Sequence, residues 1–185
     1  MKIIKFYTNE KQLIKKSASG NREAQQHLYE KYSPKMLGVC RQYIKDIHFA
    51  EDVMIDGFVK VFKNLRSFRF EGSFEGWIRR ILVNESLMWL RKRHNFNISI
   101  ESSNIEIKTT ITAQDKLQEQ DILKLLDKLP IGYRTVFNLY VIEGYKHREI
   151  AEILGVSINT SKSQLILAKK RLKSMIEQLR YPGVG

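Results

Sequence analysis

Residues 146–173 read KHREIAEILGVSINTSKSQLILAKKRLK, and this stretch decides the fold of the C-terminal part of the chain. Its first part, residues 147–154, has the apolar spacing of one short helix. Gly155 then suits the left-handed conformation that ends a helix, and Ser157 suits the cap that begins the next one. A second helix is predicted from residue 158 to about residue 173. Two helices joined by so tight a turn form a helix-turn-helix.

The two predicted helices can share a small apolar core. Ala151 is small enough to let them cross closely, and the core candidates are Ile150, Leu154, Val156, Leu165, Ala168 and Leu172. The outward face of the second helix is polar and basic with two aliphatic members, and on it we place Asn159, Thr160, Lys162, Ser163, Gln164, Ile166, Leu167 and Lys170. Such side chains can reach base edges and thymine methyl groups in the DNA major groove. The alternative is a plain helical hairpin with a solvated lysine face, and two exposed aliphatic side chains argue against it.

The charge of the chain also indicates a polyanionic partner. Its 185 residues include 32 Lys and Arg against 20 Asp and Glu, for a formal net charge of +12. The excess lies in two blocks, residues 60–95 and 146–185, separated by an acidic polar stretch at 96–121. Lysines that only keep a protein soluble would be spread more evenly, so we favour nucleic acid binding over that alternative.

The sequence contains no clear motif for catalysis, metal binding or nucleotide hydrolysis. Cys40 is the only cysteine and lies in an apolar helical pattern, where we expect a core residue. The four histidines show no metal-ligand spacing, and no phosphate-binding loop occurs. We therefore expect no cofactor, no metal ion, no small-molecule substrate and no enzymatic activity. No apolar run has the length of a signal peptide or a membrane span, which predicts a cytoplasmic protein.

Helical periodicity covers most of the chain in two blocks. The first runs from residue 10 to about residue 92, with a break at residues 67–73. The second runs from residue 117 to about residue 179, with breaks at residues 130–132 and at Gly144. With 43% hydrophobic residues, the chain can fill one ordinary domain or two small ones.

The segment between the two blocks has a different character. Residues 95–114 are rich in Asn, Ser, Thr and Ile and show no compact core pattern, which is typical of a linker. An extended strand over residues 98–107 stays open as an alternative, because isoleucines recur there at even spacing. We predict an all-α protein of two small helical domains, residues 1–95 and 117–185, joined by a flexible linker at residues 96–116.

The helix predicted over residues 48–65 has an unusual solvent face. Opposite its apolar stripe lie Asp52, Ile55, Asp56 and Val59. Two aliphatic side chains flanked by carboxylates are typical of a protein interface, which combines an apolar centre with a charged rim. Ordinary scattered surface residues would look the same, so the pattern alone does not decide between the two.

The following segment mixes aromatic and basic side chains. Phe68, Phe70, Phe74, Trp77 and Trp89 alternate with arginines along residues 66–93. This composition suits single-stranded DNA, because unstacked bases lie on aromatic faces while cations contact the phosphates. The alternative is an ordinary aromatic core under a basic surface, and we expect it to hold for Phe74.

Taken together, these patterns resemble the extracytoplasmic-function (ECF) group of the sigma-70 family of RNA polymerase sigma factors. The N-terminal likeness runs through FAEDVMIDGFVKVFKNL at residues 49–65 and SFRFEGSFEGWIRRILVNESLMWLRKR at residues 67–93. The C-terminal likeness is LPIGYRTVFNLYVIEGYKHREIAEILGVSINTSKSQLILAKKRL at residues 129–172. The ordered set covers most of residues 20–178 and is far more specific than any one motif.

The resemblance implies promoter recognition, promoter melting and transcription initiation. The N-terminal domain would bind the clamp helices of the polymerase β′ subunit through Asp52, Ile55, Asp56 and Val59, and the C-terminal domain would meet the β flap. Bases of the melted downstream promoter element would contact Phe68, Arg69, Gly72, Ser73, Trp77, Arg80, Asn84 and Met88. The upstream element, read as duplex, would contact Arg148, Asn159, Thr160, Lys162, Ser163, Gln164, Ile166, Leu167 and Lys170. In many members an anti-sigma factor clamps both domains, so it is a further candidate partner.

Three positions depart from the family pattern. Met88 stands where many relatives have Asp or Asn, which predicts the loss or replacement of one polar base contact. Ser161 occupies a position that is usually aliphatic, and we expect it to loosen the recognition helix. Gln164 replaces a common arginine, which would remove a phosphate or guanine contact.

Three other functions each account for part of the sequence pattern. An autonomous helix-turn-helix regulator explains the C-terminal part but leaves the N-terminal patterns without a role; we see no dimerisation helix and expect a monomer when free. A nucleic-acid-processing enzyme could hold a metal ion on Asp52 and Asp56, which lie one helical turn apart, but no third ligand obviously converges on them. A purely protein-binding adaptor is hard to reconcile with a net charge of +12.

Overall fold

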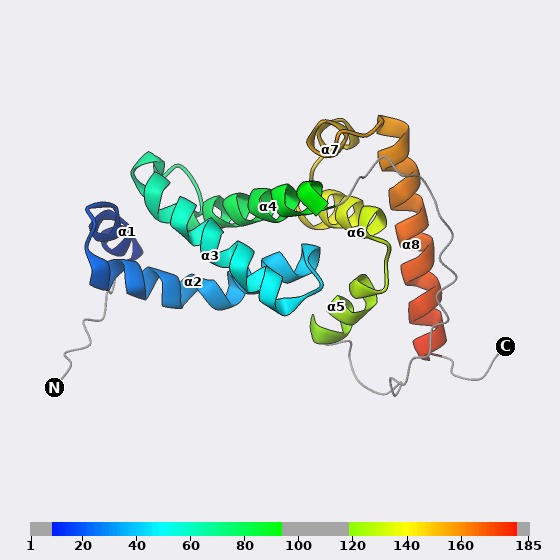
Figure 1. Ribbon diagram of the computed structural model, residues 1–185, viewed down its shortest axis with the longest axis horizontal. Coiled ribbons are helices and arrows are strands. Elements are labelled where there is room, and N and C mark those ends of the chain that lie inside the picture. The colour runs from blue at the N-terminus through cyan, green and yellow to red at the C-terminus, as the bar shows by residue number, and fades with distance from the viewer. Residues whose placement is uncertain (1–8, 94–118, 181–185) are drawn as a thin grey trace. The chain divides into compact units, whose positions relative to one another are not determined.

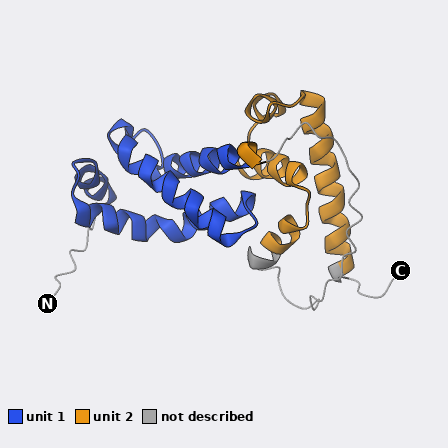
Figure 2. Ribbon diagram, in the orientation of Figure 1, with its two compact units in different colours: residues 1–90 blue, residues 91–185 orange. Residues whose placement is uncertain are grey.

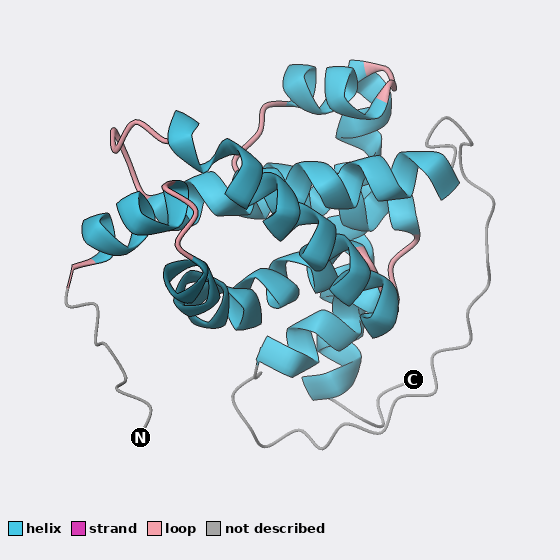
Figure 3. Cartoon of the chain, turned by 60° about the vertical axis from the view of Figure 1, so that its left-hand side comes forward, coloured by secondary structure: helices cyan, strands magenta, loops and turns pink. Residues whose placement is uncertain are grey.

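A computed structural model of the chain describes residues 9–93 and 119–180. The chain divides into two compact units, residues 1–90 and 91–185, which Figure 2 shows in different colours. Within the described ranges every element is a helix, which confirms the predicted all-α class (Figure 3). The predicted linker at residues 96–116 and the alternative strand at residues 98–107 lie outside the described residues.

The described residues of the N-terminal unit form four α-helices and one 3₁₀ turn (Figure 1). They are α1 (Glu10–Ala18), α2 (Arg22–Tyr43), α3 (Ile47–Asn64), η1 (Leu65–Ser67) and α4 (Phe74–Arg93). The side-chain oxygens of Asn9, Asn21 and Asp46 accept hydrogen bonds from backbone N–H groups in the first turns of α1, α2 and α3. These caps satisfy donors that have no partner inside the helix, which explains where the three helices begin.

The core of the N-terminal unit lies among α2, α3 and α4, and α1 lies against α2 and η1. Cys40 is fully buried there, as the sequence predicts. The Leu82 side chain of α4 packs directly on the backbone of α3 at Gly57. A Cβ atom on this glycine would lie 2.3 Å from Cδ1 of the buried Leu82. The absence of a side chain at Gly57 therefore sets how closely the two helices pack.

The C-terminal unit is built around its longest helix. Its elements are α5 (Glu119–Asp127), α6 (Ile131–Phe137), the π-helical turn η2 (Asn138–Ile142), α7 (His147–Leu154) and α8 (Ile158–Arg180). Helices α6 and α7 pack against α8 (Figure 1). Gly155 ends α7 with a φ of +67°, as the helix-turn-helix pattern predicts. Two bounds differ from the prediction: α8 continues past residue 173, and residues 131–132 begin α6 rather than interrupting a helix.

A buried ion pair joins α5 to α6. The Arg134 side chain is 1% exposed, and its Nη1 lies 2.6 Å from Oδ1 of Asp127, whose side chain is 28% exposed. A guanidinium removed from water in this way is strongly destabilising unless a carboxylate compensates its charge. The pair therefore fixes α5 against α6. None of the described helices is both long and apolar enough to span a membrane.

Candidate nucleic-acid interface

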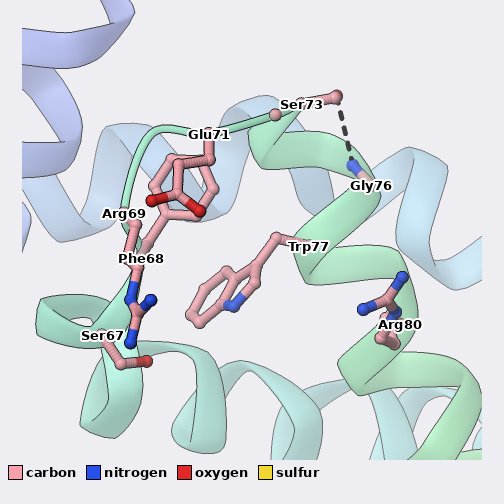
Figure 4. A pocket seen from close by; sticks show the side chains of 9 residues that line it. Ser67, Phe68, Arg69, Glu71, Ser73, Gly76, Trp77 and Arg80 are labelled. Atoms are coloured by element: carbon pink, nitrogen blue, oxygen red, sulfur yellow. Dashed lines mark hydrogen bonds between the residues drawn. The ribbon is translucent and has the colours of Figure 1, made fainter.

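A pocket lies where the loop after η1 meets the first turns of α4 (Figure 4). Its volume is about 510 Å³, and it is lined by Ser67, Phe68, Arg69, Glu71, Gly72, Ser73, Gly76, Trp77 and Arg80. Ser73 begins α4, since its Oγ accepts a 3.3 Å hydrogen bond from the N–H of Gly76. This cap fixes the junction of loop and helix, so the two sides of the pocket keep their spacing.

Aromatic contacts hold the pocket wall in place. The ring centroid of Phe68 lies 5.0 Å from that of Phe74 and 5.5 Å from that of Trp77. Phe74 is buried, as predicted, and packs edge-on against Tyr32 of α2 at 5.5 Å. Phe68 and Trp77 are only half-buried and line the cavity. The pocket thus presents aromatic surface on a wall anchored in the core.

Charged side chains flank these rings. Arg69 lies on the loop and Arg80 lies one turn beyond Trp77 on α4, and both are exposed (Figure 4). Glu71 also lines the pocket and brings a carboxylate that the sequence prediction did not include. Cations beside aromatic faces suit a nucleotide, whose base stacks while its phosphate is neutralised. A carboxylate can accept a hydrogen bond from an exocyclic amino group of a base.

The structure brings most of the predicted downstream-element residues together, but not all of them. Six of the eight line the pocket: Phe68, Arg69, Gly72, Ser73, Trp77 and Arg80. Asn84 and Met88 lie on later turns of α4, where both are exposed outside the pocket. Sequence reasoning missed Ser67, Glu71 and Gly76, although each lies between or next to predicted positions and could have been included on that ground.

The acidic and apolar face of α3 is exposed along its whole length. Ile55 is 51% and Val59 is 45% exposed, and Asp52 and Asp56 are exposed beside them. The opposite side of α3 is buried against the core through Val53, Met54, Phe58 and Val61. Two aliphatic side chains on one solvent-facing stripe form an apolar surface that the described residues do not cover. Within residues 9–93 and 119–180, no cluster of three or more His, Cys, Asp or Glu side chains could hold a metal ion.

The helix-turn-helix presents most of its predicted contact residues to solvent. Ile166 is 66% exposed, and the other exposed members are Arg148, Asn159, Lys162, Ser163 and Lys170. Thr160 is half-buried, and its backbone N–H donates a 2.9 Å hydrogen bond to Oγ of Ser157, which directly precedes α8. The first turns of α8 therefore carry a mixed polar and aliphatic surface suited to a DNA groove.

Two predicted DNA contacts are covered, wholly or in part, by other helices of the C-terminal unit. Gln164 is only 8% exposed and packs on α6, where a Cβ atom added to Gly132 would lie 3.0 Å from its Nε2. Leu167 is half-buried and packs against the core formed with α5 and α6. The buried stripe of α8 continues from Leu165 and Ala168 back to Ser161 and Gln164, at helical spacing. Because these last two residues are polar, the stripe is not visible in the hydrophobic pattern.

Ser161 links the two helices of the motif through a side-chain hydrogen bond. It is fully buried, and its Oγ lies 2.9 Å from Nδ1 of His147, the first residue of α7. The His147 ring in turn stacks on Tyr140 with centroids 4.6 Å apart. Partial burial, and to a lesser extent the nearby Lys162 and Lys169, lower the pKa of His147. The neutral imidazole of His147 is thus favoured at the contact between α7 and α8.

Comparison with known families covers both units. Residues 28–96 match the family described as Sigma-70 region 2, and residues 119–172 match the one described as Sigma-70, region 4. The chain is 26% identical over 182 residues to the ECF RNA polymerase sigma factor SigW of Bacillus subtilis, covering 91% of this chain and 97% of that protein. It is also 26% identical over 180 residues to the ECF RNA polymerase sigma-E factor of Haemophilus influenzae, covering 90% and 95% of the two chains.

A solved structure shows the same likeness. The sigma factor RpoE of Bartonella quintana, crystallised with the anti-sigma factor NepR, matches 82% of this chain and 96% of its own. The TM-score is 0.50 and the sequence identity is 25%. The fold of this chain therefore resembles that of a solved sigma factor.

Proposed function

The chain belongs to the extracytoplasmic-function group of the sigma-70 family, and from that premise we propose that it binds core RNA polymerase and promoter DNA and so directs promoter recognition, promoter melting and transcription initiation. Residues 1–95 would serve the polymerase and the melted downstream element, and residues 117–185 the upstream element. The observation that carries the proposal is the pocket beside α4, because its aromatic and cationic lining suits an unpaired base. No step requires catalysis by the chain, since binding energy can drive melting.

The pocket would hold one base flipped out of the opening duplex. Its volume of about 510 Å³ lies within the usual range for ligand pockets. Flipping a base costs about a few kcal/mol of lost stacking and pairing, which contacts in the pocket must offset. The rings of Phe68 and Trp77 can replace the lost stacking, and Arg69 and Arg80 are placed to neutralise phosphates.

The exposed face of α3 would bind the polymerase. Ile55 and Val59 supply an apolar centre, and Asp52 and Asp56 supply an acidic rim that suits a basic partner surface. The β′ clamp helices are the expected partner from the family resemblance, and the C-terminal unit would meet the β flap. Because core RNA polymerase works in the bacterial cytoplasm, the proposed function also assigns the protein to that compartment.

The helix-turn-helix would read the upstream element as duplex. Asn159, Lys162, Ser163 and Ile166 are exposed on the early turns of α8, where a recognition helix contacts base edges. Both DNA-binding units belong to one chain, so binding by the first raises the effective concentration of the second. An anti-sigma factor is a further proposed partner, because the Bartonella relative is bound to one.

The first experiment measures binding of the complete protein to bacterial core RNA polymerase. The test variant is Asp52→Ala/Asp56→Ala/Val59→Ala, which removes the centre and rim of the α3 face. The matched control is Glu23→Ala/Gln26→Ala/Glu30→Ala, which changes three exposed positions on α2. We expect tight binding by the wild type and the control, and weakening by about tenfold or more in the test variant, because interface centres carry most of the binding energy.

Other results would lead to a different function. If the wild type binds duplex DNA but not core polymerase, the chain is an autonomous helix-turn-helix regulator. If a metal chelator abolishes its function, the nucleic-acid-processing enzyme gains support. DNA binding through phosphates should weaken steeply as salt rises, because counterions are released. Binding that is insensitive to salt would favour a protein-binding adaptor instead.

A further inference from the structure

Phe70, in the loop between η1 and α4, has an unusual backbone conformation. Its φ is +59°, and within residues 9–93 and 119–180 it is the one residue other than glycine with a positive φ. Bulky side chains are strained in this region, which glycine enters freely. Strain of this kind persists only where the surrounding structure or the function requires the residue. The strain therefore raises the question of what the phenyl ring contributes at this position.

Packing does not account for the ring. Phe70 is 38% exposed, so its side chain is not part of the buried core. Its centroid lies 4.9 Å from that of Phe68, whose ring forms a wall of the base pocket, but Phe70 itself does not line that pocket. The left-handed turn thus places a second aromatic side chain beside the pocket, with surface open to solvent.

A cation is held next to this ring by a separate element. Nζ of Lys11, on α1, lies 5.5 Å from the Phe70 centroid. Helix α1 is fixed at this position, because Nε of Arg66 donates a 3.2 Å hydrogen bond to the carbonyl of Ala18, and Glu10 pairs with Lys31 of α2 at 2.5 Å. Among the described residues, no carboxylate lies within ion-pair distance of Lys11, so its charge is available to a ligand.

We propose that Phe70 and Lys11 form a second binding position for single-stranded DNA, next to the base pocket. An unpaired base stacks on Phe70, and the Lys11 ammonium contacts a phosphate of the same nucleotide. The inference rests on the proposed function and extends it to the nucleotide adjacent to the flipped base. Since every base has a stacking face, this position adds affinity without reading sequence. Helix α1 lies outside the matched residues 28–96, so the contribution of Lys11 is not part of the matched region.

The test uses the complete protein and a fluorescein-labelled single-stranded dT12, followed by anisotropy over a series of salt concentrations. Phe70→Gly removes the ring and relieves the strained backbone, so its melting temperature should equal or exceed that of the wild type. We expect its Kd to rise about 5- to 100-fold, the loss typical of one base–aromatic stack. Phe70→Tyr keeps the ring and should bind within about twofold of the wild type.

The lysine is tested separately. Lys11→Gln should weaken binding and make the negative slope of log K against log salt shallower by about 0.7, the value for one phosphate contact to a single strand. Lys15→Gln is the matched control, because Lys15 is equally exposed on α1 and has no contact with Phe70. It should leave the affinity and the slope nearly unchanged.

The pocket variant Arg69→Ala/Arg80→Ala separates this inference from the function on which it rests. If that variant loses dT12 binding while Phe70→Gly binds as the wild type does, the second position does not exist and the proposed function stands. If the wild type does not bind dT12, the second binding position is also ruled out. Binding to core polymerase, measured separately, decides the proposed function.

Discussion

Replacing Gly57 by alanine tests the contact between α3 and the Leu82 side chain of α4. The added Cβ would lie 2.3 Å from Cδ1 of Leu82 and 3.3 Å from its Cδ2 and Cγ. Carbon atoms pack best at about 3.5–4.0 Å, so the Leu82 side chain or the whole helix must move. Leu82 is fully buried, and rotation of its side chain is therefore blocked by its neighbours.

Two opposing effects set the size of the change. Forcing an extra methyl group into a packed core costs about 1–3 kcal/mol. Alanine is favoured over glycine in a helix by about 1 kcal/mol. Because the clash is severe, we expect Gly57→Ala to lower the free energy of unfolding by about 1–2 kcal/mol, and each kcal/mol lowers the melting temperature of a unit this size by about 4–8 °C.

Tryptophan fluorescence during urea unfolding measures this effect selectively. The chain has two tryptophans, Trp77 and Trp89, and both belong to the N-terminal unit. Gly76→Ala is the matched control, because its Cβ would meet Ser73 Cβ at an ordinary 3.7 Å. This control should be stabilised by about 0.5–1 kcal/mol, the usual gain from glycine to alanine in a helix.

A double substitution shows whether Leu82 is the cause. Leu82→Ala alone should destabilise by about 2–5 kcal/mol, since it opens a cavity. In that background Gly57→Ala should no longer destabilise, because the clashing atoms are gone. A Gly57→Ala variant as stable as the wild type, or one that loses the same free energy of unfolding in both backgrounds, would contradict a clash with Leu82.

Three further predictions concern the C-terminal unit, and hydrogen exchange or circular dichroism can follow its stability. Asp127→Ala removes the carboxylate that lies 2.6 Å from the buried Arg134 guanidinium and should destabilise the unit by about 3 kcal/mol; a change under about 0.5 kcal/mol would contradict the structural role of this contact. The folded protein lowers the pKa of His147 from its usual 6.5. As the pH falls, the imidazole is therefore protonated in the unfolded chain before it is protonated in the folded protein. The contribution of His147 to the free energy of unfolding should be fully present above pH 6.5 and be lost as the pH falls from 6.5 through the folded pKa. A His147 pKa above 6.5, measured by NMR, would contradict this pH dependence. Gln164→Leu removes a buried amide whose Oε1 has no partner among the described residues, so it should be neutral or stabilising and leave duplex affinity unchanged; a loss of more than about fivefold in affinity would restore Gln164 as a DNA contact.

Local patterns in the sequence determined the helices and the helix-turn-helix. Apolar spacing and capping residues act within a few positions of each other, so α3, α7 and the start of α8 could be predicted from the chain alone. The exposed face of α3 followed in the same way, because its apolar stripe is continuous and leaves Ile55 and Val59 on the opposite side. The family resemblance named six of the pocket residues, which are also neighbours along one loop and one helix.

The side-chain contacts between different helices and loops depend on the tertiary structure. Gln164 is buried because α6 covers it, and Ser161 is buried because His147 supplies a hydrogen-bond partner from another helix; neither neighbour is encoded within the periodicity of α8. The pairing of Phe70 with Lys11 likewise joins residues that are far apart in the chain. The burial of a polar side chain cannot be predicted until its hydrogen-bond partners are known, because those partners come from other elements of the fold. Helix formation, by contrast, depends largely on adjacent residues in the chain.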